Sequence, residues 1–145
     1  MLEVRDERVW ILLTDRPLDT AAAADFLRDE SAGGLDLFLG ITRRWTGDRE
    51  TAELEYEAYG NMAVEEMRRL AERAITRWPL VKVVVHHRIG VVPVTQSSVI
   101  VGSSAPHRRD AFESTRFLID TLKEEVPIWK RERFADGETE WVENR

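Results

Sequence analysis

The chain has 145 residues, of which 43% are hydrophobic and 33% charged, and its formal net charge is −6. These values indicate one globular domain and exclude a disordered chain. The absence of cysteine excludes a disulfide framework, a thiolate nucleophile and a cysteine metal site. No apolar run approaches the roughly 20 residues of a membrane span, and no signal peptide is visible, so we expect a cytoplasmic protein without a membrane partner.

The N-terminal part of the chain predicts a strand followed by a helix. Residues 8–14, RVWILLT, are apolar and rich in strand-forming side chains. Asp19 or Thr20 can cap a helix that contains four consecutive alanines. The small residues SAGG at 31–34 are expected to stop this helix.

Two strands and an amphipathic helix are predicted next. Residues 35–43 and 52–59 favour strands, and the polar segment between them favours a loop or a wide hairpin tip. From Asn61 the apolar residues recur every three or four positions, which predicts a helix that Pro79 ends.

The remaining elements complete a mixed α+β pattern. They are strands at 80–88 and 97–105, a helix from Pro106 or His107 to Pro127, an extended segment at 127–134 and a short strand at 139–143. The order β-α-β-β-α-β-β-α-β-β fits a single domain over residues 1–145, with helices packed on a largely antiparallel sheet.

Charge is unevenly distributed along the chain. Residues 1–80 carry 11 basic and 17 acidic side chains, whereas residues 81–134 carry 9 and 6. An acidic body with a basic C-terminal third does not suit a nucleic-acid-binding protein, which normally has a broad basic face. It better suits a local pocket for a small anion or for the acidic tail of a partner.

Lysine is rare, and two of the three lysines are close together. The chain holds 18 arginines but only Lys82, Lys123 and Lys130. Arginine keeps its proton in proteins, whereas a desolvated lysine can lose its proton. A lysine that acts as nucleophile or as acid and base could therefore not be replaced by arginine. The alternative interpretation is a basic residue that stabilises the C-terminus of a helix.

Two further segments contain candidate anion ligands. In SSAPHRRDAF, residues 103–112, His107 and Arg108 lie in the first turn of a predicted helix, where free backbone N–H groups also attract anions. Arg43 and Arg44 end a predicted strand and enter a loop. The alternatives are a solvated first helical turn and an ordinary pair of surface arginines.

Helix length separates the candidates. Arg108 and Lys123 are 15 residues apart, which is roughly 22 Å along a helix at about 1.5 Å per residue. Both ends of one helix cannot contact the same small substrate. Either they serve different sites, or a second copy brings His107 and Arg108 to the lysines, which predicts a symmetric dimer with shared sites.

Other catalytic patterns are absent from the sequence. His86 and His87 lie on a predicted strand, so we expect one to point inward and one outward. No third ligand stands at a suitable spacing, and we therefore predict no metal site. No G-x-S-x-G, P-loop or G-x-G-x-x-G motif is present.

Six segments together resemble a known family. FLGITR, LEYEAYGNMA, HHRIGVVPV, SVIVGSSAPHRRDAF, LKEEVPIWKRE and EWVENR are similar, in order and spacing, to the large catalytic subunit of molybdopterin synthase. The resemblance covers about residues 35–145. It implies an α/β-hammerhead fold and a central homodimer that binds two small ubiquitin-like subunits, which makes a heterotetramer.

The resemblance also implies a reaction. The small subunit ends in a thiocarboxylate that enters a pocket on the large subunit. Two sulfurs are transferred in turn to cyclic pyranopterin monophosphate, which gives the dithiolene of molybdopterin. Because the sulfur arrives on the partner, no cofactor and no cysteine are expected.

Carried over by position, the resemblance implies the following site residues. They are the essential lysine Lys123, the second lysine Lys130, and Arg43, Arg145, His107 and Arg108, the last two contributed by the neighbouring large subunit. We assign proton movement to Lys123, and stabilisation of negative charge or binding of the tail to Lys130. Arg44 and Trp45 depart from the family pattern, so we expect a different pocket rim.

Two other functions remain as alternatives. A non-catalytic adaptor that only docks a ubiquitin-like partner would tolerate arginine at positions 123 and 130. A small phosphoesterase would use His107 and the arginines, but it would need a metal cluster or a nucleophile that the sequence does not show.

Overall fold

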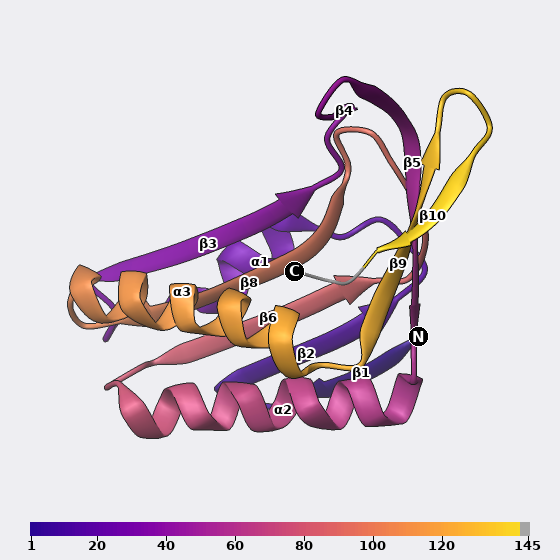
Figure 1. The fold of residues 1–145 in the computed structure, drawn as a ribbon. Helices are drawn as coiled ribbons and strands as arrows, with labels where there is room; N and C mark the ends of the chain where they lie inside the picture. Colours follow the sequence, from indigo (N-terminus) through magenta and orange to yellow (C-terminus); the bar gives the residue numbers. More distant parts are fainter. Residues whose placement is uncertain (143–145) are drawn as a thin grey trace.

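Two β-sheets and three helices make up residues 1–142, the part of the chain that this computed structural model describes (Figure 1). The main sheet has five strands in the order β1 (Leu2–Arg5), β2 (Val9–Thr14), β6 (Lys82–Arg88), β8 (Ser97–Ala105) and β3 (Gly34–Ile41). The small sheet has the order β10 (Thr139–Val142), β9 (Ile128–Phe134), β5 (Arg49–Ala58) and β4 (Trp45–Thr46), and β7 (Gly90–Pro93) also pairs with β5.

The strand pairing confirms the mixed α+β fold class. Within residues 1–142, only β2 and β6 pair in parallel, and the other pairs are antiparallel. The sequence analysis missed β1, whose residues alternate between apolar and charged and are mostly exposed. The sequence favours a loop or an edge element at 89–94 and a loop or hairpin tip between 43 and 52, and the structure has the short strands β7 and β4 there, of four and two residues.

The three helices begin and end close to the predicted positions. They are α1 (Thr20–Leu27), α2 (Gly60–Arg77) and α3 (Arg108–Glu125). The Asp19 carboxylate accepts a hydrogen bond from the backbone N–H of Ala22 at 3.0 Å, which confirms the predicted cap. α1 ends at Leu27, before the SAGG segment that was expected to stop it. No helix within residues 1–142 is both long enough and apolar enough to cross a membrane.

The helices cover both faces of the main sheet. Val83 and Val85 of β6 pack on the side of α2 and α3, whereas Val84 packs on the side of α1. Side chains alternate between the two faces along a strand, so each face of β6 needs apolar residues. This explains why three consecutive valines, Val83 to Val85, stand in β6. Figure 1 shows the small sheet rising from one end of the main sheet, beyond the helices.

His86 and His87 correct one expectation. We expected one of the two rings to point outward, but both side chains are 1% exposed. The His86 ring packs edge-on against Trp10 at 4.3 Å, and neither of its nitrogens has a hydrogen-bond partner within residues 1–142. His87 lies on the opposite face. The prediction was wrong because it assumed a sheet with one solvent-exposed face.

Stability should therefore fall as the pH is lowered. Burial, assisted by nearby positive charge, lowers the pKa of His86 and of His87 from 6.5 to about 4. Between pH 6.5 and 4 the unfolded chain binds more protons than the folded chain. The free energy of unfolding therefore falls by about 3 kcal/mol for each histidine as the pH is lowered from above 6.5 to 4.

Urea unfolding at pH 7.5 and at pH 4.5 measures this loss. The His86→Leu variant removes one of the two histidines and fills its apolar site. We expect its free energy of unfolding to depend on pH less steeply than that of the unaltered chain, by about 2–3 kcal/mol over this interval. An unchanged pH dependence would show that His86 does not titrate with the predicted shift.

Candidate active site

A pocket of about 430 Å³ lies where the main sheet meets the small sheet. Its walls come from the end of β3 and the residues after it, from the C-terminal half of α3, and from β5, β6 and β9. In Figure 1, α3 runs toward β9, and β3 leads past the same region toward β4. The charged side chains that line the pocket are Arg43, Lys123, Lys130 and Glu132.

The end of α3 brings the two lysines together. Lys123 lies in the last turn of the helix, and Val126 is its C-cap. Pro127 follows, and β9 begins at once, so that Lys130 is its third residue. Because a helix and a strand meet here at a sharp turn, both lysines line the same pocket, as predicted.

A buried threonine positions Arg43. Thr42 is 1% exposed, and its hydroxyl donates a hydrogen bond to the carbonyl oxygen of Val92 at 3.2 Å. Its backbone also exchanges hydrogen bonds with the segment at 95–96. Thr42 therefore fixes the chain just after β3, and the next side chain, Arg43, lines the pocket.

Arg44 and Trp45 do not line the pocket, contrary to the expectation of an altered rim. The Arg44 guanidinium pairs with the Glu50 carboxylate at 2.9 Å, across the β4–β5 hairpin. Its charged end also lies 5.9 Å from the centre of the Trp45 ring. Arg44 and Trp45 thus interact with the hairpin, and Thr46 is the next lining residue.

The surroundings of Lys130 in the pocket lower the pKa of its side chain. Burial, together with the positive charges of Lys123 and Arg43, lowers the pKa of Lys130, and the negative charge of Glu132 partly opposes this. A lowered pKa makes the ammonium of Lys130 a better proton donor and its neutral amine more accessible. Loss of the proton on desolvation is the property that distinguishes lysine from arginine at this position.

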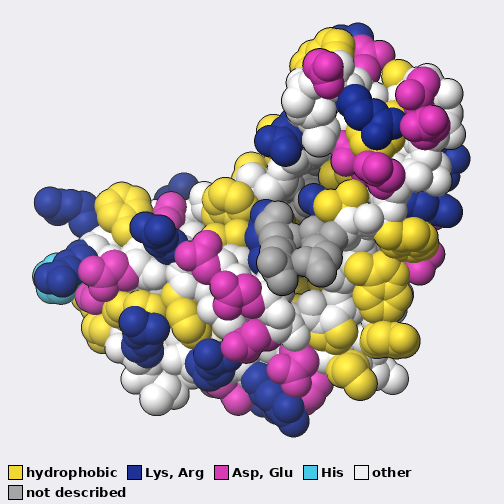
Figure 2. Space-filling view, in the orientation of Figure 1, with side chains coloured by type: hydrophobic (Ala, Val, Ile, Leu, Met, Phe, Trp, Pro, Cys, Tyr) yellow, Lys and Arg dark blue, Asp and Glu magenta, His cyan; other side chains and the backbone are white. Residues whose placement is uncertain are grey.

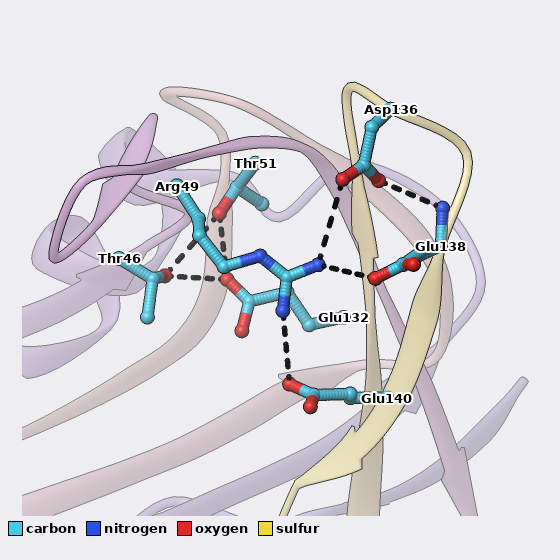
Figure 3. A network of polar contacts seen from close by, with 7 residues as sticks. All are labelled: Thr46, Arg49, Thr51, Glu132, Asp136, Glu138 and Glu140. Carbon is cyan, nitrogen blue, oxygen red and sulfur yellow. Dashed lines mark hydrogen bonds and ion pairs between the residues drawn. The ribbon is translucent and has the colours of Figure 1, made fainter.

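Glu132 is an acidic residue that the sequence analysis missed. Its Oε1 accepts hydrogen bonds from the hydroxyls of Thr46 at 2.5 Å and Thr51 at 2.6 Å (Figure 3). The side chain is 7% exposed, so the two hydroxyls stabilise a carboxylate that burial would otherwise disfavour. The alternation along β9, which places residues 130 and 132 on one face, could have indicated it.

Ion pairs join the tips of the small sheet. Figure 3 shows the Arg49 guanidinium surrounded by the carboxylates of Asp136, Glu138 and Glu140, at 3.7, 3.0 and 3.6 Å respectively. Its charged end also lies 3.4 Å from the centre of the Phe134 ring. These contacts link β5 to the hairpin of β9 and β10, which support the pocket wall.

The sequence analysis did not assign two further aromatic residues to the site. The Tyr56 and His87 rings pack edge to face at 5.0 Å, and both line the pocket. Burial, and to a smaller extent the charge of Glu132, raises the pKa of Tyr56. No local signal in the sequence distinguishes these residues from ordinary core side chains of a strand.

His107 and Arg108 lie at the other end of α3. His107 is the N-cap and Arg108 the first residue of this 18-residue helix, and both are exposed. Neither lines the pocket, which confirms the separation that the helix length predicted. Arg145, the sixth predicted site residue, lies outside the described residues.

The surface over the helices has no continuous basic area. Figure 2 shows acidic and basic side chains interspersed on the described part of this face. Ion pairs such as Arg73 with Glu125 at 2.6 Å and Arg109 with Glu113 at 3.0 Å account for part of this mixing. The face in view therefore lacks the basic surface that a nucleic acid would require.

Comparison with known proteins identifies the family. The family model described as MoaE protein matches residues 13–125, which include Arg43, His107, Arg108 and Lys123. The chain belongs to the MoaE family of molybdopterin synthase catalytic subunits. The match ends before Lys130.

Relatives and solved structures agree with this assignment. Molybdopterin synthase catalytic subunit 1 of Aedes aegypti is 42% identical over 139 residues, which are 94% of this MoaE-family chain and 90% of the relative. The corresponding protein of Taeniopygia guttata is 40% identical over 94% of this chain and 88% of its own length.

Solved structures show the same fold. The molybdopterin synthase of Staphylococcus aureus superimposes with a TM-score of 0.85 at 34% identity, over 90% of this chain and 94% of that one. The MoaE protein of Burkholderia ambifaria does so with a TM-score of 0.79 at 34% identity, over 93% and 89%. A complex of subunits 1 and 2 of molybdopterin-converting factor from Helicobacter pylori, at 23% identity and a TM-score of 0.73, shares the fold.

Proposed function

We propose that this chain is the catalytic subunit of molybdopterin synthase, a sulfurtransferase. It takes sulfur from the C-terminal thiocarboxylate of a small ubiquitin-like subunit and transfers it twice to cyclic pyranopterin monophosphate. The observation that carries this proposal is the meeting of Lys123, Lys130 and Arg43 in one pocket of a MoaE-family chain. No cofactor is needed, because the partner brings the sulfur.

The pocket suits two anions. The thiocarboxylate and the phosphate of the substrate are both negatively charged, and Arg43, Lys123 and Lys130 supply three cations to one cavity. Glu132 is held by Thr46 and Thr51, so its carboxylate is already engaged by hydroxyls at one oxygen. We infer that the tail and the substrate bind among the three cations.

Lysine supplies the proton movements. As the carbon–sulfur bond to the pterin forms, the bond between sulfur and the acyl carbon of the tail breaks, and water provides the oxygen that restores the carboxylate. An ammonium can protonate the oxygen that leaves the substrate, and a neutral amine can accept a proton from water. We assign these steps to Lys123, and the lowered pKa of Lys130 supports a part for Lys130 as well.

A second copy of the chain completes the site. His107 and Arg108 lie at the exposed N-terminus of α3, away from the pocket of their own chain. A symmetric homodimer that places this helix end at the neighbouring pocket would add a histidine and an arginine for the phosphate. With one small subunit on each copy, the assembly is a heterotetramer. A cytoplasmic location remains a prediction.

Reconstitution tests the proposed function. Purified chain, a thiocarboxylated small subunit and cyclic pyranopterin monophosphate are mixed, and molybdopterin is quantified. We expect product only when all three components are present. If no product forms although calorimetry shows that the small subunit binds, the chain is a docking adaptor, and the assignment of the lysines must be withdrawn.

A further inference from the structure

The edge strand β3 is long, apolar and exposed. Within residues 1–142 it pairs only with β8, and Figure 1 shows it on the far side of the main sheet from β1. Phe38, Leu39 and Ile41 are exposed, and Asp36 is the one charged residue among the eight of the strand. Proteins usually protect an open sheet edge by shortening the strand or by charged side chains. β3 has neither protection to any extent, which indicates that another chain covers it.

β1, the other edge strand of the main sheet, is protected in both ways. It has only four residues, of which Glu3 and Arg5 are charged. The indole N–H of Trp10 donates a hydrogen bond to the Glu3 carboxylate at 2.7 Å, and the Arg5 guanidinium lies 4.0 Å from the centre of the Trp10 ring. The contrast identifies β3 as the edge of this sheet that a further strand can join.

The backbone groups of β3 that are free to pair can be assigned. A Cβ at Gly102 of β8 would lie 2.6 Å from the carbonyl oxygen of Asp36, and the Ser98 hydroxyl of β8 donates to the carbonyl oxygen of Gly40 at 3.2 Å. The even-numbered residues therefore direct their backbone groups to β8. These directions alternate along an antiparallel strand. The open edge thus presents the N–H and C=O groups of Leu35, Leu37 and Leu39.

The pocket reaches this open edge. Four consecutive residues of β3, Phe38 to Ile41, line it. Successive side chains of a strand point to opposite faces of the sheet, so four in a row can border one cavity only where the cavity extends round the edge of the strand. A strand added to β3 would therefore form part of the pocket wall.

The two ends of β3 lie at the two ends of α3. A Cβ at Gly34 would lie 3.4 Å from the Cα of Arg108, so β3 starts beside the first turn of the helix. Ile41, at the other end of β3, lines the pocket together with Lys123. The strand spans about 23 Å between Gly34 and Ile41 at about 3.3 Å per residue. This length is close to the roughly 22 Å of helix between Arg108 and Lys123.

We propose that β3 pairs antiparallel with β3 of a second copy, about a two-fold axis at Phe38, and so joins the two five-stranded main sheets into one continuous sheet. In this register Leu37 of each copy lies opposite Leu39 of the other, so that the outward N–H and C=O groups meet. Gly34 of each copy comes opposite Thr42 of the other. The proposal deepens the proposed function, because it names the surface that would share the sites, but the pairing is tested without the reaction.

This pairing brings the start of each α3 to the pocket of the other copy. The two-fold axis is perpendicular to the sheet, so both copies of α3 lie on the same face and run antiparallel. Phe38 shares that face with Gly34, because both are even-numbered residues of one strand. The exposed Phe38 ring is then covered by its counterpart, and Arg108, which lies beside Gly34, comes next to Arg43 of the second copy.

A single cysteine tests the pairing directly, because the chain has no cysteine of its own. Residues opposite each other in a non-hydrogen-bonded antiparallel pair have Cα atoms about 4.5 Å apart, which a disulfide can span. Phe38→Cys is oxidised with oxidised glutathione, and non-reducing electrophoresis measures the linked dimer over time. Val4→Cys is the matched control, because Val4 is 38% and Phe38 39% exposed and Val4 lies on the other edge strand of the same sheet.

We expect Phe38→Cys to link at least about tenfold faster than Val4→Cys at about 10 μM chain, because thiols paired across an interface have an effective concentration in the millimolar range. The rate for Phe38→Cys should also be insensitive to dilution above the dissociation constant of the dimer. Equal rates for the two variants, or faster linkage of Val4→Cys, would overturn the proposed pairing.

Sedimentation of a second pair of variants measures the interface itself. We expect Phe38→Lys to raise the dissociation constant of the dimer at least about 10²-fold, because two covered rings are lost and like charges meet across the axis. Val4→Lys should leave this constant within about twofold. Circular dichroism checks that both variants fold, and Phe38→Ser replaces Phe38→Lys if the latter does not.

Two results of sedimentation contradict the interface. One is a Phe38→Lys variant that dimerises as tightly as the unaltered chain. The other is an unaltered chain that stays monomeric while amide exchange in β3 slows only on addition of the small subunit, since the tail of that subunit would then occupy the edge. If the variants behave as expected but the unaltered chain makes no molybdopterin, the proposed function fails and the interface stands.

Discussion

Replacing Lys123 by arginine should lower the rate of molybdopterin formation by at least about 10²-fold, because a group that moves protons contributes 10²–10⁴-fold to catalysis. Lys123→Arg retains the positive charge at the end of α3, so the contribution of that charge to the helix terminus is preserved. Arginine keeps its proton throughout the accessible pH range. The rate is measured under single-turnover conditions with a saturating thiocarboxylated small subunit.

The third lysine provides the matched control. Lys82 begins β6, its ammonium lies 5.1 Å from the centre of the Phe26 ring, and it does not line the pocket. Lys82→Arg should leave the rate within about twofold, and both variants should bind the small subunit with unchanged affinity. A Lys123→Arg variant with the normal rate would mean that only charge is needed at this position, as expected for an adaptor.

Mixing two inactive variants should restore activity if the sites are shared between copies. The double variant His107→Ala/Arg108→Ala lacks the helix end that we assign to the neighbouring pocket, and Lys123→Ala lacks the lysine. In a mixed dimer, one pocket receives both defects and the other receives neither. Random exchange of equal amounts should therefore recover about a quarter of the sites of the unaltered dimer.

The stability of the variants can be checked independently. His107 is an N-cap without a side-chain hydrogen bond, and both His107 and Arg108 are exposed. Their removal should change the free energy of unfolding by no more than about 0.5 kcal/mol. If the mixture is no more active than its components after subunit exchange has been verified by mass spectrometry, each pocket acts with residues of one chain only.

Most elements of the fold could be predicted because their signals are local. The Asp19 cap, the apolar period after Asn61 and the prolines at 79 and 127 each act within a few residues, and α1, α2 and α3 begin or end near them. The strands β6 and β8 were equally clear, because each contains three consecutive β-branched apolar residues, Val83 to Val85 in β6 and Val99 to Val101 in β8.

The pairing of the strands could not be predicted in the same way. Division into two sheets, the parallel contact of β2 with β6 and the small strands β4 and β7 depend on residues far apart in the sequence. The outward orientation expected for one histidine failed for the same reason, because α1 covers the second face only in the folded chain.

Some residues of the candidate site could be predicted from the sequence, and others could not. Lys123, Lys130 and the helix end at His107 and Arg108 were visible as unusual residue types or charges at helix termini. Tyr56 and His87 were not, because a single tyrosine or histidine on a strand carries no local signal. Glu132 could have been found only by way of Lys130, with which it shares a face of β9. Their convergence depends on the contact of β5 with β9 and on the rings of Tyr56 and His87 meeting across two sheets.

The central claim is that this chain moves sulfur from the tail of its partner to a pterin. The most direct measurement is the mass of the small subunit during a single turnover with substrate in limiting amount. We predict that the thiocarboxylate becomes a carboxylate as molybdopterin appears, with two small subunits converted for each product molecule, and that neither change occurs without this chain. Conversion of the thiocarboxylate at the same rate without the chain, or without a sulfur gained by the pterin, would contradict the assignment.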